Sequence, residues 1–169
     1  MKDEMRELRE VAQEIQSLVT SCVAEWRDLK EKVITHRPTP DSWSAKEVIG
    51  HLIDSASNNH QRFVRLQIRD SLVFPDYQHD NEYWVKIQRY QERPWQELLS
   101  LWRHFNSHVA YLIQSVNPHC LSHAWQVDSE TRISLRELMC DYLRHMKVHV
   151  VQVNECLQSK TDRSRRHRG

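Results

Sequence analysis

Glycine is almost absent from this chain. Only two glycines, Gly50 and Gly169, occur among 169 residues. A domain rich in β-sheet normally uses glycine in its turns and bulges, and the phosphate-binding loops of nucleotide-binding proteins are built on closely spaced glycines. The shortage therefore argues against a sheet-rich fold and excludes the P-loop and Rossmann motifs as sources of function.

The first half of the chain carries two helical patterns, because apolar side chains recur there at steps of three or four residues. The first pattern runs from Asp3 to Ile34 and ends before the prolines of the next segment, which cannot continue a helix. The second opens at Ser44, which forms a capping box with Glu47, and extends to about Asp70. A long connection with several aromatic side chains follows, and connections of this length are often functional.

The second half of the chain carries two further helical patterns. A third helical pattern starts near Pro94 and closes at Pro118, and a fourth opens with a second capping box, Ser134 and Glu137. Four amphipathic helices with two longer connections predict an all-α fold, a four-helix bundle with long crossover loops. We expect residues 1–158 to form this bundle and residues 159–169, which are rich in arginine, to form a basic disordered tail.

The charge balance and the spacing of the cysteines indicate the cellular compartment in which we expect this protein. Lys and Arg total 24, and Asp and Glu total 23, so the protein has no general attraction to nucleic acid or to an anionic membrane. No apolar run approaches the roughly 18 residues that span a bilayer, and the charged segment 1–10 is not a secretory signal. The four cysteines are widely spaced, as in proteins of a reducing compartment. We expect a cytoplasmic protein.

Three histidines are candidate ligands of a divalent metal. His145 and His149 are four residues apart within the fourth helical pattern, so their side chains lie on one face, roughly 6 Å apart. His51 lies on the second helical pattern. Three protein ligands leave one position of the metal open for water or substrate, which is typical of a catalytic site. The spacing alone leaves an alternative open, in which the histidines merely bond to polar neighbours on the helix flanks.

A second histidine pair has the same spacing. His104 and His108 lie on the third pattern, and we interpret them as a solvated face because they lie away from, or at the border of, its apolar stripe. The 145/149 pair is not the zinc-protease motif, since Met146 stands where that motif has its glutamate. Asp54 and Asp141 are each one helical turn from a candidate ligand, and each could support its ring or be an ordinary surface acid.

Several short motifs resemble those of the DinB/YfiT-like family, in the same order from about residue 10 to residue 157. They are Trp43-Ser-Ala-Lys-Glu-Val-Ile-Gly-His51-Leu-Ile-Asp54-Ser55 with Asn59 and Arg62-Phe63, then Pro75-Asp-Tyr77 with Asp80 and Trp84, and finally Ser134-Leu-Arg-Glu-Leu with His145-x-x-x-His149. Family members often have a further histidine immediately before the last ligand. Here that position is Val148, so the surroundings of the metal differ while the three ligands remain.

The resemblance implies a fold, a metal and a chemistry. It implies a four-helix bundle with one or two long crossovers, and a nickel or zinc ion held by the residues that match the family ligands, His51, His145 and His149. It also implies a low-molecular-weight thiol such as bacillithiol, mycothiol or glutathione, used in S-transfer or isomerisation. Other members are described as metal-dependent hydrolases.

These observations lead to a main hypothesis and two alternatives. The main hypothesis is an enzyme whose metal activates the thiol for transfer to an electrophilic small molecule, in a pocket that includes Arg62, Tyr77 and Trp84. No side chain stands out from the sequence as a catalytic acid or base. The alternatives are a hydrolase that activates water and a non-catalytic module that binds a metal or ligand. We also expect a homodimer, from the tryptophan-rich helices and the family resemblance.

Overall fold

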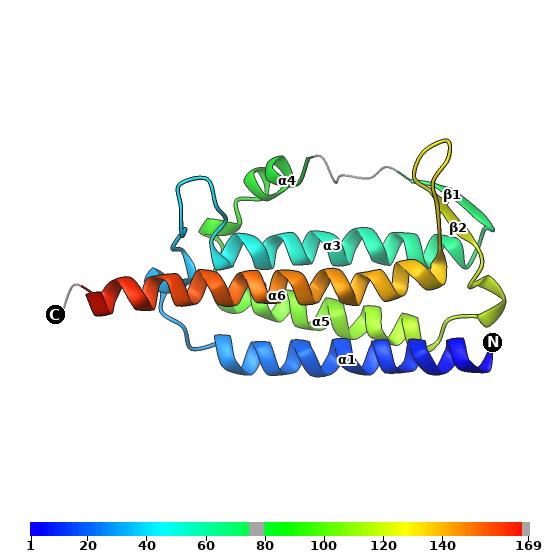
Figure 1. The fold of residues 1–169 in the computed structure, drawn as a ribbon, viewed down its shortest axis with the longest axis horizontal. Helices are drawn as coiled ribbons and strands as arrows, with labels where there is room; N and C mark the ends of the chain where they lie inside the picture. The colour runs from blue at the N-terminus through cyan, green and yellow to red at the C-terminus, as the bar shows by residue number, and fades with distance from the viewer. Residues whose placement is uncertain (75–79, 167–169) are drawn as a thin grey trace.

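The computed structural model describes residues 1–74 and 80–166, with side chains described as far as Ser159. Four long helices dominate it: α1 (Lys2–Trp26), α3 (Ala45–Leu66), α5 (Trp95–Gln114) and α6 (Leu135–Arg166) (Figure 1). The shorter elements are α2 (Glu31–Ile34), β1 (Ser71–Val73), α4 (Asn81–Ile87), the 3-10 helices η2 (Tyr90–Glu92) and η3 (Pro118–Cys120), β2 (Ala124–Gln126) and β3 (Arg132–Ser134). The prediction of an all-α four-helix bundle is confirmed.

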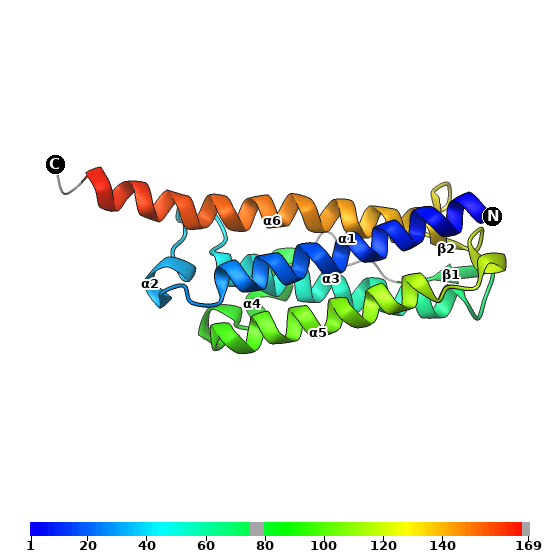
Figure 2. The same cartoon turned by 90° about the horizontal axis from the view of Figure 1, so that it is seen from below.

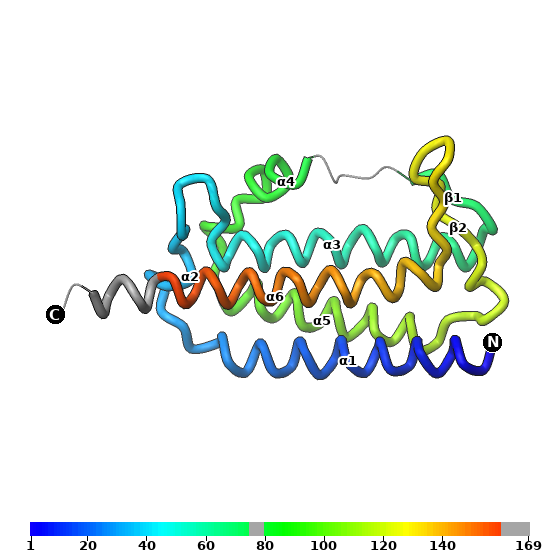
Figure 3. The backbone as a smooth tube through the Cα atoms, in the orientation of Figure 1, coloured from blue at the N-terminus to red at the C-terminus, as the bar shows by residue number. Residues whose placement is uncertain are grey.

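The bundle has two diagonal pairs of helices. Both α1 and α3 pack against α5 and α6, so α1 lies diagonally across from α3 (Figure 2). Following the chain in Figure 3, α3 and α5 run in the same direction, and α1 and α6 run in the opposite one. The connection from α3 to α5 must therefore return along the length of the bundle, and it does so outside α3, through α4 (Figure 1). This is the long crossover expected from the sequence.

The apolar faces of the helices meet in one core. The rings of Trp26 and Trp102 stack there, with centroids 5.9 Å apart, and both side chains are fully buried. A polar contact is enclosed in the same core, where the Tyr142 hydroxyl donates to Oδ1 of Asn106 at 2.5 Å. Of the helices in the described part, none combines the length and the apolar character needed to cross a bilayer.

The first helix is shorter than its apolar pattern predicts. We expected one helix from Asp3 to Ile34, but α1 ends at Trp26 and Lys30 is extended. Side chains of α5 explain the break, because the indole Nε1 of Trp95 donates to the Trp26 carbonyl at 2.8 Å and Gln96 donates to the carbonyl of Arg27. Side chains of another helix thus donate hydrogen bonds to the backbone carbonyls that a continuing helix would have used for its own hydrogen bonds.

Both predicted capping boxes are present. Ser44 caps α3, its Oγ accepting from the Glu47 amide at 3.3 Å, and Oγ of Ser134 accepts from the Glu137 amide at 3.2 Å. At its other end α3 stops at Leu66 instead of about Asp70. The last helix continues to Arg166, into the segment expected to be a tail from residue 159, since no proline or glycine interrupts it before Gly169.

A small sheet joins the two long connections, and the sequence analysis did not predict it. Strand β2 pairs in parallel with β1 and antiparallel with β3, which places Trp125 between Leu72 and Ile133. Strands of three residues are too short to show the alternation by which strands are recognised. The sheet covers the end of the bundle where α3 ends and α6 begins (Figure 1).

Candidate metal centre

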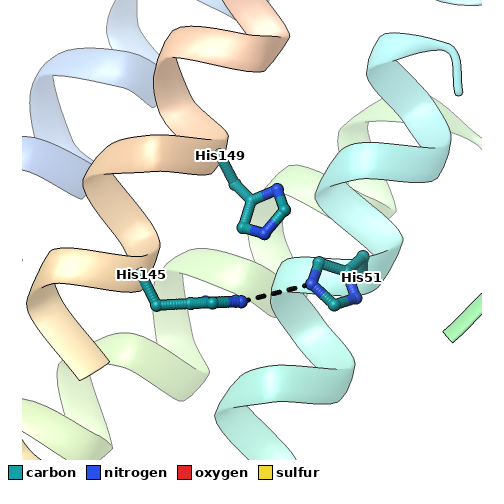
Figure 4. Close-up of side chains that lie close together, drawn as sticks. All are labelled: His51, His145 and His149. Carbon is teal, nitrogen blue, oxygen red and sulfur yellow. Dashed lines mark hydrogen bonds between the residues drawn. The ribbon is translucent and has the colours of Figure 1, made fainter. Parts of the chain in front are cut away.

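Three histidines from two neighbouring helices meet at one point between α3 and α6. His51 comes from α3, and His145 and His149 come from successive turns of α6 (Figure 4). One ring nitrogen from each lies within 4.8 Å of the others, and Nε2 of His51 is 3.4 Å from Nε2 of His145. The structure therefore brings together the three side chains that the sequence analysis named, because α3 and α6 pack side by side.

The surroundings keep the three rings neutral. Burial lowers the pKa of His51 to about 3, with smaller effects from His149 and His145. Burial and then the proximity of His149 lower the pKa of His145 to about 4. Burial also lowers the pKa of His149, partly offset by its hydrogen bond to Gln152. Metal ions bind imidazole only through an unprotonated nitrogen, so these shifts leave the ligand atoms available at neutral pH.

Hydrogen bonds orient two of the rings. Nδ1 of His149 lies 2.7 Å from Oε1 of Gln152. An amide oxygen only accepts, so Nδ1 carries the proton and Nε2 has the free lone pair. Nδ1 of His145 lies 3.4 Å from Oγ of Ser55, and Asn59 holds Ser55 through its carbonyl at 3.0 Å. Such contacts fix ring orientation at metal sites.

The two acids considered as supports for the ligands have other partners. Asp54 accepts from the Tyr90 hydroxyl at 2.7 Å and from Nε2 of Gln88 at 2.6 Å. Asp141 pairs with Arg144 at 2.8 Å. Uncharged side chains, Gln152 and Ser55, support the rings instead. Sequence reasoning missed Gln152, although its position three residues after His149 on the same helix face was a usable signal.

A cavity of about 440 Å³ adjoins two of the three histidines and extends along α3. His51 and His145 line one part of it, and Arg62 and Trp125 line another. Arg62 thus lines the same cavity as two of the candidate metal ligands. Trp84 is not among the described lining residues and is 38% exposed, and Tyr77 lies outside the described residues. The aromatic wall comes from Trp125 of the unpredicted sheet.

The rival pair lies apart from this cluster. His104 and His108 are exposed on α5. The first contacts the backbone carbonyl of Ser100 at 2.8 Å, and the second lies against His60, with ring centroids 5.2 Å apart. Neither belongs to the group of side chains that could share a metal. Their placement agrees with the interpretation of a solvated helix face.

The donor set suits a transition metal with an open position. All three candidate ligand atoms are imidazole nitrogens, which are good ligands for zinc, nickel, copper and iron. Three protein ligands beside a cavity match the arrangement of a catalytic metal site more closely than the four-ligand shell of a structural one. The residues present therefore fit a divalent metal.

Fold and site together define a helical-bundle protein with a candidate three-histidine metal centre between two antiparallel helices. The chain belongs to the DinB superfamily, whose model matches residues 7–153. Among solved structures it is similar to YfiT from Bacillus subtilis, described as a probable metal-dependent hydrolase with an unusual four-helix bundle topology. The two share 16% sequence identity, with a TM-score of 0.77 over 95% of this chain and 90% of that one. At this identity the likeness concerns the fold. No curated protein matches the chain.

Proposed function

We propose that this protein is a metal-dependent enzyme in which His51, His145 and His149 hold one divalent ion, nickel or zinc. The observation that carries the proposal is the meeting of three imidazoles of lowered pKa, two of which line a cavity of about 440 Å³. When bound, such a metal lowers the pKa of a coordinated thiol or water and so supplies a nucleophile near neutral pH.

The reaction that we propose is transfer of a low-molecular-weight thiol to an electrophilic small molecule. The lining of the cavity supports it, because among the described lining residues the one carboxylate, Asp141, is paired with Arg144. The metal would lower the pKa of either nucleophile, but hydrolases commonly use a further acid–base side chain to transfer a proton during the reaction, whereas a thiolate attacks an electrophile without one. The chain's own residues would orient the ligand rings, through Gln152 and Ser55, and bind the substrate beside them.

Hydrolysis is the second candidate. It is favoured by the description of YfiT as a probable metal-dependent hydrolase. The two candidates share the metal site and differ in the nucleophile, so they can be distinguished by whether turnover requires a thiol.

The first experiment measures bound metal in purified protein by mass spectrometry. We expect one ion per chain in the wild type, and loss of stoichiometric metal in His51→Ala, His145→Ala and His149→Ala. The matched control is the pair His104→Ala and His108→Ala, which should keep full metal content. Circular dichroism verifies that each variant is folded. Full metal content in all three ligand variants would contradict the proposal.

The second experiment supplies the metal-loaded protein with an aryl halide and with bacillithiol, mycothiol or glutathione in turn. Thioether formation that depends on both the metal and the thiol supports S-transfer. Release of phenol from an activated ester at the same rate with and without thiol, and without thioether formation, would favour the hydrolase instead.

A further inference from the structure

Helix α3 presents histidines to two neighbouring helices. His51 faces α6 and belongs to the candidate metal centre. His60 follows nine positions later on α3, which is about two and a half helical turns, so the two side chains leave the helix in opposite directions. The helix packs against both α5 and α6, which lie on opposite sides of it (Figure 2). His60 therefore faces α5 and lies away from the first three histidines.

On that side of α3, His60 lies against His108 of α5. The centroids of the two rings are 5.2 Å apart, with 42° between the ring planes. Phe105, one turn before His108, contacts His60 edge to face, with centroids 5.7 Å apart, and its side chain is partly buried. The phenyl ring thus helps to hold the His60 ring in place. Burial, and then the proximity of His108, lower the pKa of His60, so its ring is neutral near pH 7.

The separation of the two rings suits a shared metal ion. A zinc ion bonded to two imidazole nitrogens at about 2.1 Å lies about 3.2 Å from each ring centroid, and a tetrahedral angle between the two bonds then puts the centroids about 5.2 Å apart. The three rings of the candidate metal centre have centroids 4.4, 4.5 and 5.3 Å apart. The pair of His60 and His108 therefore has the spacing of histidines that can share an ion.

The ring nitrogens of this pair are available to a ligand. In the part of the chain that the structure describes, no protein group forms a hydrogen bond with a ring nitrogen of His60 or His108. His108 is also exposed, so its ring can turn without disturbing the core. His104, one turn earlier on α5, differs because its Nδ1 donates to the carbonyl of Ser100 at 2.8 Å. Imidazole nitrogens favour transition metals over magnesium and calcium.

From this geometry we propose that His60 and His108 bind a second divalent ion, of the zinc type, which joins α3 to α5 on the side away from the three-histidine centre. The proposal does not depend on the proposed function. Two ligands hold an ion less tightly than three, because each added ligand on the same scaffold binds with a high effective concentration. The second ion is therefore lost on dialysis against metal-free buffer, and the site fills only at a higher concentration of free zinc.

The first test is equilibrium dialysis of the folded protein against increasing concentrations of zinc. At saturation the wild type should bind one zinc ion more per chain than His60→Gln or His108→Gln does. The matched control is His104→Gln, which removes an exposed histidine of the same helix and should bind as much zinc as the wild type. Equal zinc content in the wild type and His60→Gln would overturn the proposal.

The same measurement separates this site from the three-histidine centre. If that centre bound no metal, the zinc content of the wild type and of His60→Gln would each fall by one ion, and the difference between them would remain. The proposed function would then fail while the second site stood. If the difference vanished while the wild type kept one ion, the second site would fail alone.

Nuclear magnetic resonance of the 15N-labelled imidazole rings then identifies the ligands. During the weaker binding step, zinc should shift the nitrogen signals of His60 and His108 and leave those of His104 in place. Shifts in His104 and His108 without His60 would overturn the proposal, because the ion would then be held by two turns of α5 alone. Shifts in none of these rings would show that the weaker zinc binds elsewhere, and would overturn it too.

Thermal unfolding tests whether the ion joins the two helices. An ion that binds only the folded state stabilises it, and at a free zinc concentration about 10 times the dissociation constant of the weaker step the melting temperature should rise by about 3–6 °C. The rise should be absent in His60→Gln and present in His104→Gln. Magnesium at the same concentration should have no such effect. An equal rise in His60→Gln, or with magnesium, would contradict the proposal.

Discussion

The ring of Tyr90 lies directly against Gly50. A Cβ atom built at position 50 would be 2.1 Å from Cδ2 of Tyr90, so only glycine fits there. One turn further along α3, the Tyr90 hydroxyl donates to Asp54 at 2.7 Å. The 3-10 helix η2, which ends the long crossover, is thereby fixed to α3 beside His51, the first candidate ligand.

Gly50→Ala should destabilise the protein by about 1–3 kcal/mol, the usual cost of overpacking. In an unconstrained helix the same change would stabilise by about 1 kcal/mol, so the sign of the effect is informative. Urea denaturation measures it. The same substitution in a Tyr90→Ala background should cost much less, because the clash is gone. A Gly50→Ala protein more stable than the wild type would contradict the contact.

Gln152→Leu should weaken metal binding about 10–100-fold, the usual effect of removing a group that orients a ligand. The substitution removes the acceptor 2.7 Å from Nδ1 of His149 and leaves the three ligands in place. Competition with a chelator of known affinity measures the change. Ser55→Ala is the comparison and should have a smaller effect, since its contact with His145 is 3.4 Å long. Unchanged affinity in Gln152→Leu would show that His149 is oriented by packing alone.

Acid should destabilise the metal-free protein. The pKa of His51 is about 3 and that of His145 about 4 in the folded state, whereas an unfolded histidine has a pKa of about 6.5. Below pH 6.5 the unfolded chain therefore binds protons that the folded site does not, and the free energy of unfolding falls. For His51 alone the loss reaches about 2 kcal/mol at pH 5.

Urea denaturation at pH 7 and pH 5 tests this dependence on pH. The wild type should lose more stability between the two values than His51→Gln does, because the variant lacks one of the depressed groups. The exposed His104 provides the control, and His104→Gln should behave as the wild type. Equal losses in the wild type and His51→Gln would show that the pKa of His51 is not depressed.

Chelation of the metal should leave the bundle folded. The buried apolar side chains of the four long helices pack against one another without it, and the three histidines are a small part of the interface between α3 and α6. Far-ultraviolet circular dichroism should be unchanged after chelation, while the melting temperature falls because a ligand that binds only the folded state stabilises it. Loss of helicity together with the metal would indicate a structural ion.

The four helices and the shared face of His145 and His149 could be predicted from the sequence because both depend on local periodicity, whereas His51 joined them as a candidate ligand through the family resemblance. Apolar spacing marked the helices, the pairs Ser44–Glu47 and Ser134–Glu137 marked two starts, and the spacing of His145 and His149 marked one face. The end of α1 at Trp26 could not be predicted, since it depends on donors from α5. The role of Trp125 was missed for a similar reason, because three-residue strands carry too weak a pattern.

The expected homodimer stays a prediction, and the structure weakens one of its grounds. Trp26, Trp95 and Trp102, which suggested an interface, are buried within the chain's own core. The sequence indicates that a tryptophan side chain is buried, but it does not show whether the core of the same chain or a partner chain buries it. Sedimentation at micromolar concentration would measure the mass of the assembly directly.

The candidate ligands lie on two helices that are far apart in the sequence, and this would affect the unfolded chain. His51 and His145 are separated by 94 positions, so an ion held by both would close more than half of the sequence into a single loop. A permanent bond that closes about 100 residues restricts the unfolded chain by roughly 4–5 kcal/mol in the entropic account. An ion would close the same loop reversibly. The metal concentration around the protein would then determine how strongly the unfolded chain is restricted.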